Sequence, residues 1–171
     1  MNTVYIGLGS NLSDPAKQIQ LAVDAIGQIK CSTITALSSL YFSRPMGPAD
    51  QPDYMNAVLE LSTELAPLAL LDELQHIENN AGRIRKDNRW GPRILDLDII
   101  LFGNQEINCD RLTVPHYGMR EREFVILPLL EIAQELTLPD GTKITTLSQQ
   151  IDDNGLKIYG NLHYALRNSC K

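Results

Sequence analysis

The sequence predicts an α+β fold with a ferredoxin-like β-α-β-β-α-β core, an antiparallel sheet, helices packed on it and a C-terminal extension. Three observations predict it. Four segments have the apolar alternation or the β-branched and aromatic composition of strands. Two intervening segments carry apolar residues at helical spacing, each with a proline at its start. No repeat, low-complexity tract or linker divides the chain, so residues 1–171 are expected to form a single domain.

The first half of the chain supplies a strand, a helix and a second strand. Residues 3–9 alternate apolar and small side chains and are expected to form the first strand. Asp14 and Pro15 then mark a helix start, as the N-cap and the first helical residue. Residues 33–42 are expected to form the next strand, because they are β-branched at first and aromatic at the end.

The second half repeats the pattern. Residues 54–61 alternate again and predict a third strand, and Pro67 opens a second helix that stops near Gly82. The fourth strand follows it. A further helical segment is expected at 124–132, and residues 140–171 are interpreted only as a helix or strand that closes the sheet.

Composition narrows the classes of protein that fit. The chain has 171 residues, a formal net charge of −6 and 43% apolar residues, which fits one well-filled soluble domain and opposes a dedicated nucleic-acid binder. It shows neither a secretory signal nor a membrane span, so we expect a cytoplasmic monomer. The cysteines are odd in number, scattered and free of a C-x-x-C motif, which is typical of reduced thiols: Cys31, Cys109 and Cys170.

The expected fourth strand, residues 94–102, carries two aspartates on one face, Asp96 and Asp98. The other face is expected to hold Leu95, Leu97, Ile99 and Leu101. The aspartate Cα atoms would lie about 6.6 Å apart. At that separation the two charges repel by roughly 2.5 kcal/mol at an effective dielectric constant of 20. The pair is therefore either a solvated strand face or a platform for a divalent metal such as Mg²⁺.

The segment before this strand favours phosphate chemistry. Residues 82–93 hold five cationic side chains against one carboxylate, a net charge of +4 on an acidic chain. Guanidinium groups bind phosphate oxygens well, and the carboxylates beside them would hold the metals of a polyphosphate. The glycines, proline and tryptophan in this segment favour a mobile lid over a plain solvated loop.

Other motifs were weighed one at a time. The sequence Gly7-Leu-Gly9 lacks the third glycine of a dinucleotide fingerprint, and its glycines are interpreted as letting the strand end and turn. No P-loop sequence is present. His116, among cationic residues, is interpreted as a structural residue or a neutral phosphate contact. Tyr54 and Asn56 share a strand face, either as packing residues or as a site for a flat, hydrogen-bonding heterocycle.

Taken together, these residues resemble the 6-hydroxymethyl-7,8-dihydropterin pyrophosphokinase family. The sequence RWGPRILDLDII at 89–100 is similar to the family signature. Further similar segments occur in the same order over about residues 4–140: GSNL at 9–12, GP at 47–48, QPDYMN at 51–56, Glu78 with GR at 82–83, PH at 115–116, REF at 122–124, PL at 128–129 and EIA at 131–133.

The resemblance implies an enzyme of folate biosynthesis that moves the β,γ-diphosphate of ATP to the pterin hydroxymethyl group and releases AMP. It implies two Mg²⁺ ions on Asp96 and Asp98, with ATP as co-substrate, and Asp96 also at the substrate hydroxyl. The implied pterin contacts are Ser43, Pro45, Met46, Tyr54, Asn56, Trp90, Asp96 and Phe124. Tyr54 and Phe124 would enclose the pterin ring.

The implied ATP contacts are Gln75, Glu78, Arg85, Arg93, Ile99, Arg111, Thr113, His116, Tyr117 and Arg122. Glu78 is implied near the ribose and His116 near a phosphate. Arg83 and Arg93 are implied as cationic residues of the catalytic loop, over which Trp90 would fold.

Two departures and two rival functions accompany this interpretation. Arg44 stands beside the expected pterin loop where the family often has a smaller residue, and Gln134 replaces a frequent proline. A nucleotidyltransferase would use the same paired aspartates but release pyrophosphate. A ferredoxin-like RNA-binding module would explain the sheet and the basic segment, but the run of stacking aromatic residues is missing and the net charge opposes it.

Overall fold

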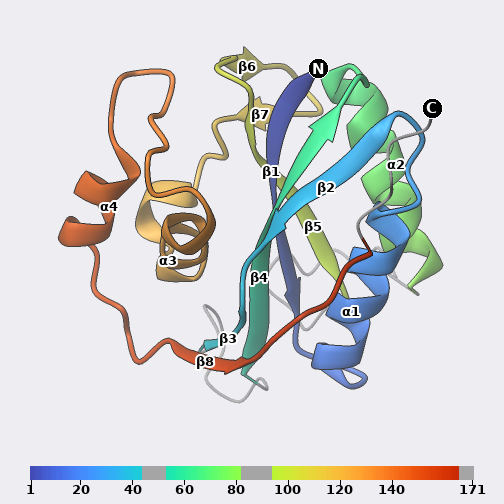
Figure 1. Cartoon of the computed structure of the whole chain (residues 1–171), viewed down its shortest axis with the longest axis horizontal. Helices are drawn as coiled ribbons and strands as arrows, with labels where there is room; N and C mark the ends of the chain where they lie inside the picture. The colour runs from blue at the N-terminus through green and yellow to red at the C-terminus, as the bar shows by residue number, and fades with distance from the viewer. Residues whose placement is uncertain (44–52, 82–93, 166–171) are drawn as a thin grey trace.

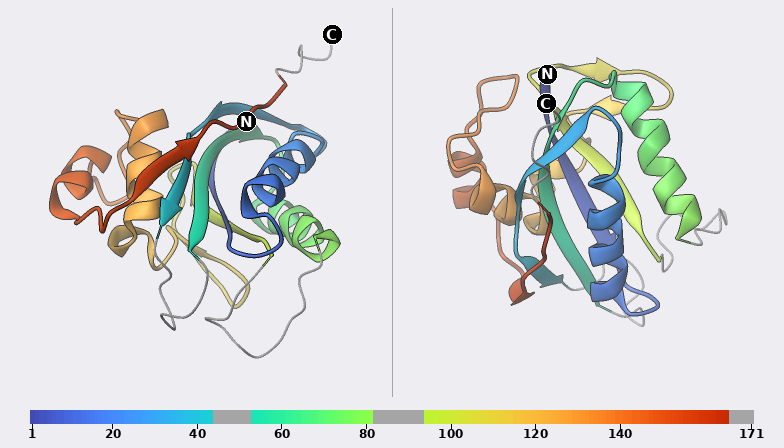
Figure 2. Two further views of the ribbon diagram at one scale, coloured as in Figure 1. Left: turned by 90° about the horizontal axis from the view of Figure 1, so that it is seen from below. Right: turned by 45° about the vertical axis from the view of Figure 1, so that its right-hand side comes forward.

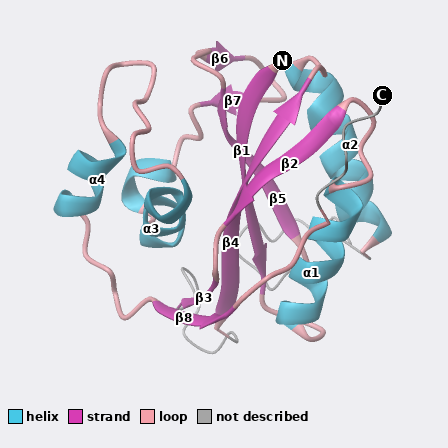
Figure 3. Ribbon diagram, in the orientation of Figure 1, coloured by secondary structure: helices cyan, strands magenta, loops and turns pink. Residues whose placement is uncertain are grey.

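The computed structural model describes residues 1–43, 53–81 and 94–165 (Figure 1). The chain forms both helices and strands, which Figure 3 distinguishes by colour. In order, the elements are β1 (Asn2–Ser10), α1 (Pro15–Ile26), β2 (Ser32–Leu37), β3 (Leu40–Ser43), β4 (Tyr54–Thr63), α2 (Pro67–Asn80), β5 (Asp96–Phe102), β6 (Ile107–Asn108), β7 (Thr113–Val114), the 3-10 helix η1 (Met119–Glu121), α3 (Glu123–Ile132), α4 (Ile144–Gln150) and β8 (Lys157–Gly160).

The main sheet is antiparallel, with the strand order β5-β1-β4-β3-β8 and with β2 also paired to β4. The predicted α+β class with an antiparallel sheet is therefore confirmed. The β6–β7 hairpin forms a separate small sheet. No helix among the described residues is both long enough and apolar enough to cross a bilayer.

One face of the sheet is covered by α1 and α2, as predicted (Figures 1 and 2). The apolar stripes of the two helices pack on alternate residues of β1, β4 and β5, such as Ile6, Leu59 and Leu97. This cluster is the larger of the two hydrophobic clusters. It takes every second residue of these strands, which explains why apolar residues alternate in the sequence.

The other face carries a second apolar cluster under α3 and α4, which the sequence did not predict as a layer (Figure 2). Tyr5, Val58 and Ile100 from the sheet meet Ile126 and Leu129 from α3. Residues 140–171 contribute both α4 and β8, and β8 pairs with β3 at the sheet edge. The sheet therefore lies between two helical layers.

A β-bulge in β5 overturns the prediction that Leu101 shares a face with Leu97 and Ile99. Ile6 pairs with Ile99, but Tyr5 pairs with Leu101, so one extra residue, Ile100, stands in β5. A bulge of one residue reverses the side-chain alternation beyond it. Leu101 consequently packs under α3, and Phe102 takes its place in the α1–α2 cluster.

Two further predictions are corrected. The expected strand at 33–42 is broken at Ser38, whose hydroxyl accepts a hydrogen bond from the Val58 N–H at 2.9 Å and donates one to the Ser39 carbonyl at 2.8 Å. Asp14 does precede α1, but its side chain makes no capping bond. Its φ of 60° is left-handed, whereas a capping residue ordinarily has an extended backbone.

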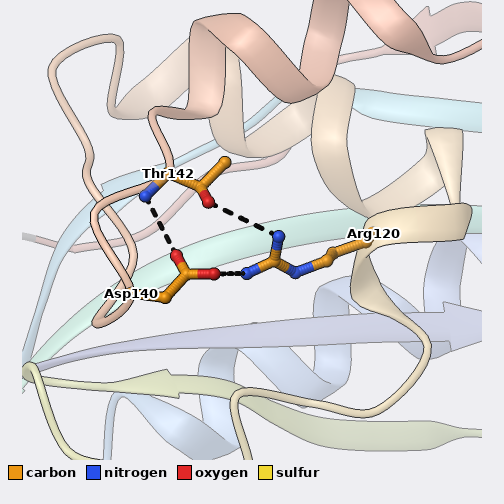
Figure 4. Close-up of polar contacts among 3 residues, drawn as sticks. All are labelled: Arg120, Asp140 and Thr142. Atoms are coloured by element: carbon orange, nitrogen blue, oxygen red, sulfur yellow. Dashed lines mark hydrogen bonds and ion pairs between the residues drawn. The ribbon is translucent and has the colours of Figure 1, made fainter.

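The loop between α3 and α4 is fixed by Asp140 (Figure 4). One carboxylate oxygen accepts the Thr142 N–H at 2.9 Å, and the other accepts a bond from Arg120 of η1. Arg120 also reaches the Thr142 hydroxyl. The bond from the Thr142 backbone N–H lowers the pKa of Asp140 most. Together with the side-chain bonds from Thr142 and Arg120, it brings this pKa to about 2.

Glu131 fastens α3 to the sheet. Its carboxylate accepts a bond from the Tyr41 hydroxyl at 2.6 Å and from the Ser39 N–H at 2.7 Å. Burial, together with the bond to Glu131, raises the pKa of Tyr41. The helix that bears Phe124 is thereby held against the turn between β2 and β3.

Replacing Glu131 by Gln should lower the free energy of unfolding by about 1 kcal/mol, because a charged acceptor shared by several donors is lost. Urea denaturation measures the change. Glu135→Gln, an exposed substitution just beyond the same helix, is the matched control. Equal stability of the two variants would contradict the anchoring role of Glu131.

Candidate active site

A cavity of about 480 Å³ lies at the end of the sheet where β5 begins. Its walls include residues of α2 and of α3, which cover opposite faces, so the cavity crosses the β5 edge. It is lined by every predicted site residue that the structure describes: Ser43, Tyr54, Asn56, Gln75, Glu78, Asp96, Asp98, Ile99, Arg111, Thr113, His116, Tyr117, Arg122 and Phe124.

The remaining predicted site residues lie outside the described residues. They are Pro45, Met46, Arg83, Arg85, Trp90 and Arg93, and Arg44 lies there too.

The floor of the cavity is set by strand register. Gly9 of β1 pairs with Asp96 on one side and with Asn56 on the other, and Gly7 pairs with Asp98. A Cβ on Gly9 would lie 3.2 Å from the Asn56 side-chain oxygen. Both glycines lie within β1, so the prediction that they let the strand end is wrong. Gly9 leaves the space beside the Asn56 amide free of a side chain.

Asn56 is held by a neighbour on the adjacent strand. Its amide nitrogen donates to the Ser43 hydroxyl at 2.6 Å, and both side chains are buried. An asparagine inside a strand is unfavourable unless it is bonded, and this bond fixes the direction of its amide. Tyr54 and Phe124 bring aromatic rings to the same cavity.

Glu78 ties the end of α2 to β5. Its carboxylate, only 4% exposed, accepts the N–H of Leu97 at 3.0 Å. Leu97 is the residue between the two aspartates. The bond therefore fixes the backbone on which both Asp96 and Asp98 stand.

Arg111 places a positive charge in the cavity wall near α2. It pairs with Asp72 at 2.5 Å and also donates to Gln75 at 3.3 Å. The pair is exposed, so it contributes little to stability. Sequence analysis missed Asp72. Its spacing of three residues from Gln75 on a helix is the signal that could have found it.

His116 is a neutral imidazole at the centre of the site. The Gly118 N–H donates to its Nδ1 at 3.1 Å, so the neutral ring carries its proton on Nε2, which faces the Asp98 carboxylate at 3.9 Å. Burial and the neighbouring Arg122 guanidinium lower the pKa of His116 to about 4. The ring stacks on Tyr117 with centroids 4.5 Å apart.

Arg122 lines the cavity close to two aromatic rings. Its guanidinium carbon is 5.6 Å from the centre of the Tyr117 ring and 5.8 Å from that of Phe124. Both distances are within the range of a cation–π contact. One cation therefore contacts Tyr117, a predicted ATP contact, and Phe124, a predicted pterin contact.

The donor set of the aspartates fits a hard divalent cation. Both carboxylates line the cavity, and the Asp98 side chain is half exposed. Among residues 1–43, 53–81 and 94–165, no group of three or more histidine, cysteine or acidic side chains could hold a metal. Two carboxylates without a full protein cage match the way Mg²⁺ is bound together with phosphates and water.

Comparisons with known proteins show the family of the chain. Residues 5–134 match the family described as 7,8-dihydro-6-hydroxymethylpterin-pyrophosphokinase, which confirms the resemblance carried by residues 89–100. The chain is 55% identical to a 2-amino-4-hydroxy-6-hydroxymethyldihydropteridine pyrophosphokinase of Haemophilus influenzae over 154 residues, 90% of this chain and 96% of the relative. A relative of the same name from Pseudomonas aeruginosa is 54% identical over 84% of this chain and 88% of its own length.

A solved structure of Plasmodium falciparum HPPK-DHPS with pteroate aligns with a TM-score of 0.69 at 15% identity. The alignment covers 87% of this chain and 42% of that one, so this chain spans less than half its length. At that identity the likeness shows the fold alone.

The pKa of His116 gives a direct test of the site in the ligand-free protein. NMR titration should find the imidazole neutral down to about pH 5, with a midpoint near 4. Arg122→Gln should raise that midpoint, because a neighbouring cation is removed. Since the unfolded state takes up the proton first, near pH 6.5, this group reduces stability as pH falls from about 6.5 to about 4. A midpoint near 6.5 in the native protein would contradict the buried, cation-flanked environment.

Proposed function

The chain belongs to the 7,8-dihydro-6-hydroxymethylpterin-pyrophosphokinase family, and from this premise we propose that it transfers the β,γ-diphosphate of ATP to the hydroxymethyl group of 6-hydroxymethyl-7,8-dihydropterin. The products are AMP and the pterin diphosphate, an intermediate of folate biosynthesis. The observation that carries the proposal is one cavity in which Asp96 and Asp98 lie between an amide-and-aromatic wall and a cationic wall.

The pterin occupies the side formed by β3, β4 and α3. Tyr54 and Phe124 enclose its ring, and Asn56, oriented by Ser43, bonds its polar edge. Pro45, Met46 and Trp90 are assigned to this side from the family resemblance.

ATP occupies the side formed by α2, β5 and residues 109–122. Ile99, Gln75 and Thr113 line the nucleotide end, with Glu78 near the ribose. Arg111, His116 and Arg122 face the phosphates, and His116 contributes an Nε2–H donor without adding charge. Tyr117 completes this wall, and Arg83, Arg85 and Arg93 are assigned here from the resemblance.

Asp96 and Asp98 would hold two Mg²⁺ ions, which when bound neutralise the triphosphate and orient its oxygens. The pterin oxygen forms a bond to the β-phosphorus while the bond from that phosphorus to the α,β-bridging oxygen breaks. AMP leaves with the electron pair, and the hydroxyl proton is released. The protein supplies positioning and charge, which is what phosphoryl transfer mainly requires.

The finer structural assignments also belong to this proposal. The order β5-β1-β4 with β2 beside β4 supports a ferredoxin-like core. We further infer that the chain acts as a cytoplasmic monomer on small-molecule substrates only, without nucleic acid or a membrane as partner.

Product analysis tests the reaction. Purified protein with ATP, Mg²⁺ and 6-hydroxymethyl-7,8-dihydropterin should form AMP in a pterin-dependent manner and release no pyrophosphate. Pyrophosphate release would instead favour nucleotidyl transfer at the same aspartates. Absence of both products would overturn the proposed function.

Asp98→Ala should fold normally and reduce turnover by about a hundredfold or more at saturating Mg²⁺, because half of the metal platform is lost. Steady-state kinetics measures the loss, and thermal unfolding checks the fold. Asp24→Ala, at an exposed position of α1, is the matched control. Nearly normal turnover of the Asp98 variant would contradict the assignment.

A further inference from the structure

Gly118 lies directly behind the guanidinium of Arg122. A Cβ at this glycine would stand 2.8 Å from the Arg122 Nε and 2.9 Å from its Cζ. Carbon atoms in normal contact are about 3.5–4.0 Å apart, so a side chain at position 118 would force the Arg122 guanidinium to move. The glycine itself is buried at the start of η1.

The conformation of Gly118 does not by itself require glycine. Its φ of −102° and ψ of 1° are open to other residues. Its N–H bond to His116 Nδ1 would persist with any L-residue except proline. The one property that its surroundings demand is therefore the missing side chain.

We propose that Gly118 is a positioning residue, whose missing side chain seats the Arg122 guanidinium between Tyr117 and Phe124. This role rests on the proposed function, in which Arg122 binds the phosphates of ATP beside the pterin ring. A methyl group at position 118 displaces the end of a flexible side chain and leaves the backbone in place. The substitution therefore misplaces the cation while the fold is retained.

The experiment uses Gly118→Ala, with Gly160→Ala as the matched control, because an added Cβ at Gly160 meets nothing within 4 Å among the described residues. The first readout is the NMR signal of the Arg122 Nε–H, which lies close to two aromatic rings. Gly118→Ala should move this signal toward the position of an exposed arginine, and Gly160→Ala should leave it unchanged. An unmoved signal in the Gly118 variant would overturn the proposal.

The second readout separates this role from a general structural one. The dissociation constant of a non-hydrolysable ATP analogue should rise about tenfold in Gly118→Ala, as expected when a charge-assisted bond is lost. In an Arg122→Ala background, Gly118→Ala should change this dissociation constant less than about twofold, because the guanidinium that the methyl group displaces is absent. An equal factor in both backgrounds would overturn the proposal.

Two controls keep the outcome decisive. If Gly118→Ala unfolds, the double variant with Arg122→Ala should fold, because the crowded atoms are removed. A double variant that also unfolds would show that the clash is with other atoms and would overturn the proposal. The NMR and binding readouts do not depend on turnover. Failure of the native chain to form AMP would overturn the proposed function without changing the test of Gly118.

Discussion

The pairing of β5 with β1 is the constraint on which the candidate site depends. Gly9 stands opposite Asp96, and Gly7 stands opposite Asp98, so both carboxylates face the α3 side of the sheet over a floor without side chains. A slip of one residue in this register would turn both aspartates into the apolar layer under α1 and α2. The bulge at Ile100 reverses the alternation of side chains within β5. The strand can therefore expose polar residues at its start and still bury Phe102 under α1 and α2 at its end.

Two carboxylates, those of Glu78 and Glu131, hold the helices that form walls of the cavity around that floor. Glu78 joins α2 to the backbone between the aspartates, and Glu131 joins α3 to the turn between β2 and β3. Each fixes one helical layer relative to the sheet, so the cavity walls formed by α2 and by α3 are held in place around Asp96 and Asp98.

The sequence predicted the elements that repeat a simple period and lacked the information for those that break one. Strands β1 and β4 and helices α1 and α2 follow from alternation, helical spacing and the prolines at 15 and 67. The bulge at Ile100 and the break at Ser38 could not be predicted, because each depends on bonds to a strand distant in sequence. The second helical layer was missed for a similar reason: α3 was expected as a helix, but nothing local showed which face it covers.

Most residues of the candidate site were predicted from the family resemblance, and those that the structure describes line one cavity. Asp72 was not predicted because its partner, Arg111, is distant in sequence, and Gly118 was not predicted because a glycine carries no chemical group that marks a site. In the proposed function, strand register makes Asp96 and Asp98 a metal platform that faces the nucleotide. Electron paramagnetic resonance of Mn²⁺, with an ATP analogue whose α,β-bridge is a methylene, tests it most directly. The account predicts two bound ions per chain and their loss when both aspartates are changed to asparagine; unchanged ion binding in that variant would contradict it.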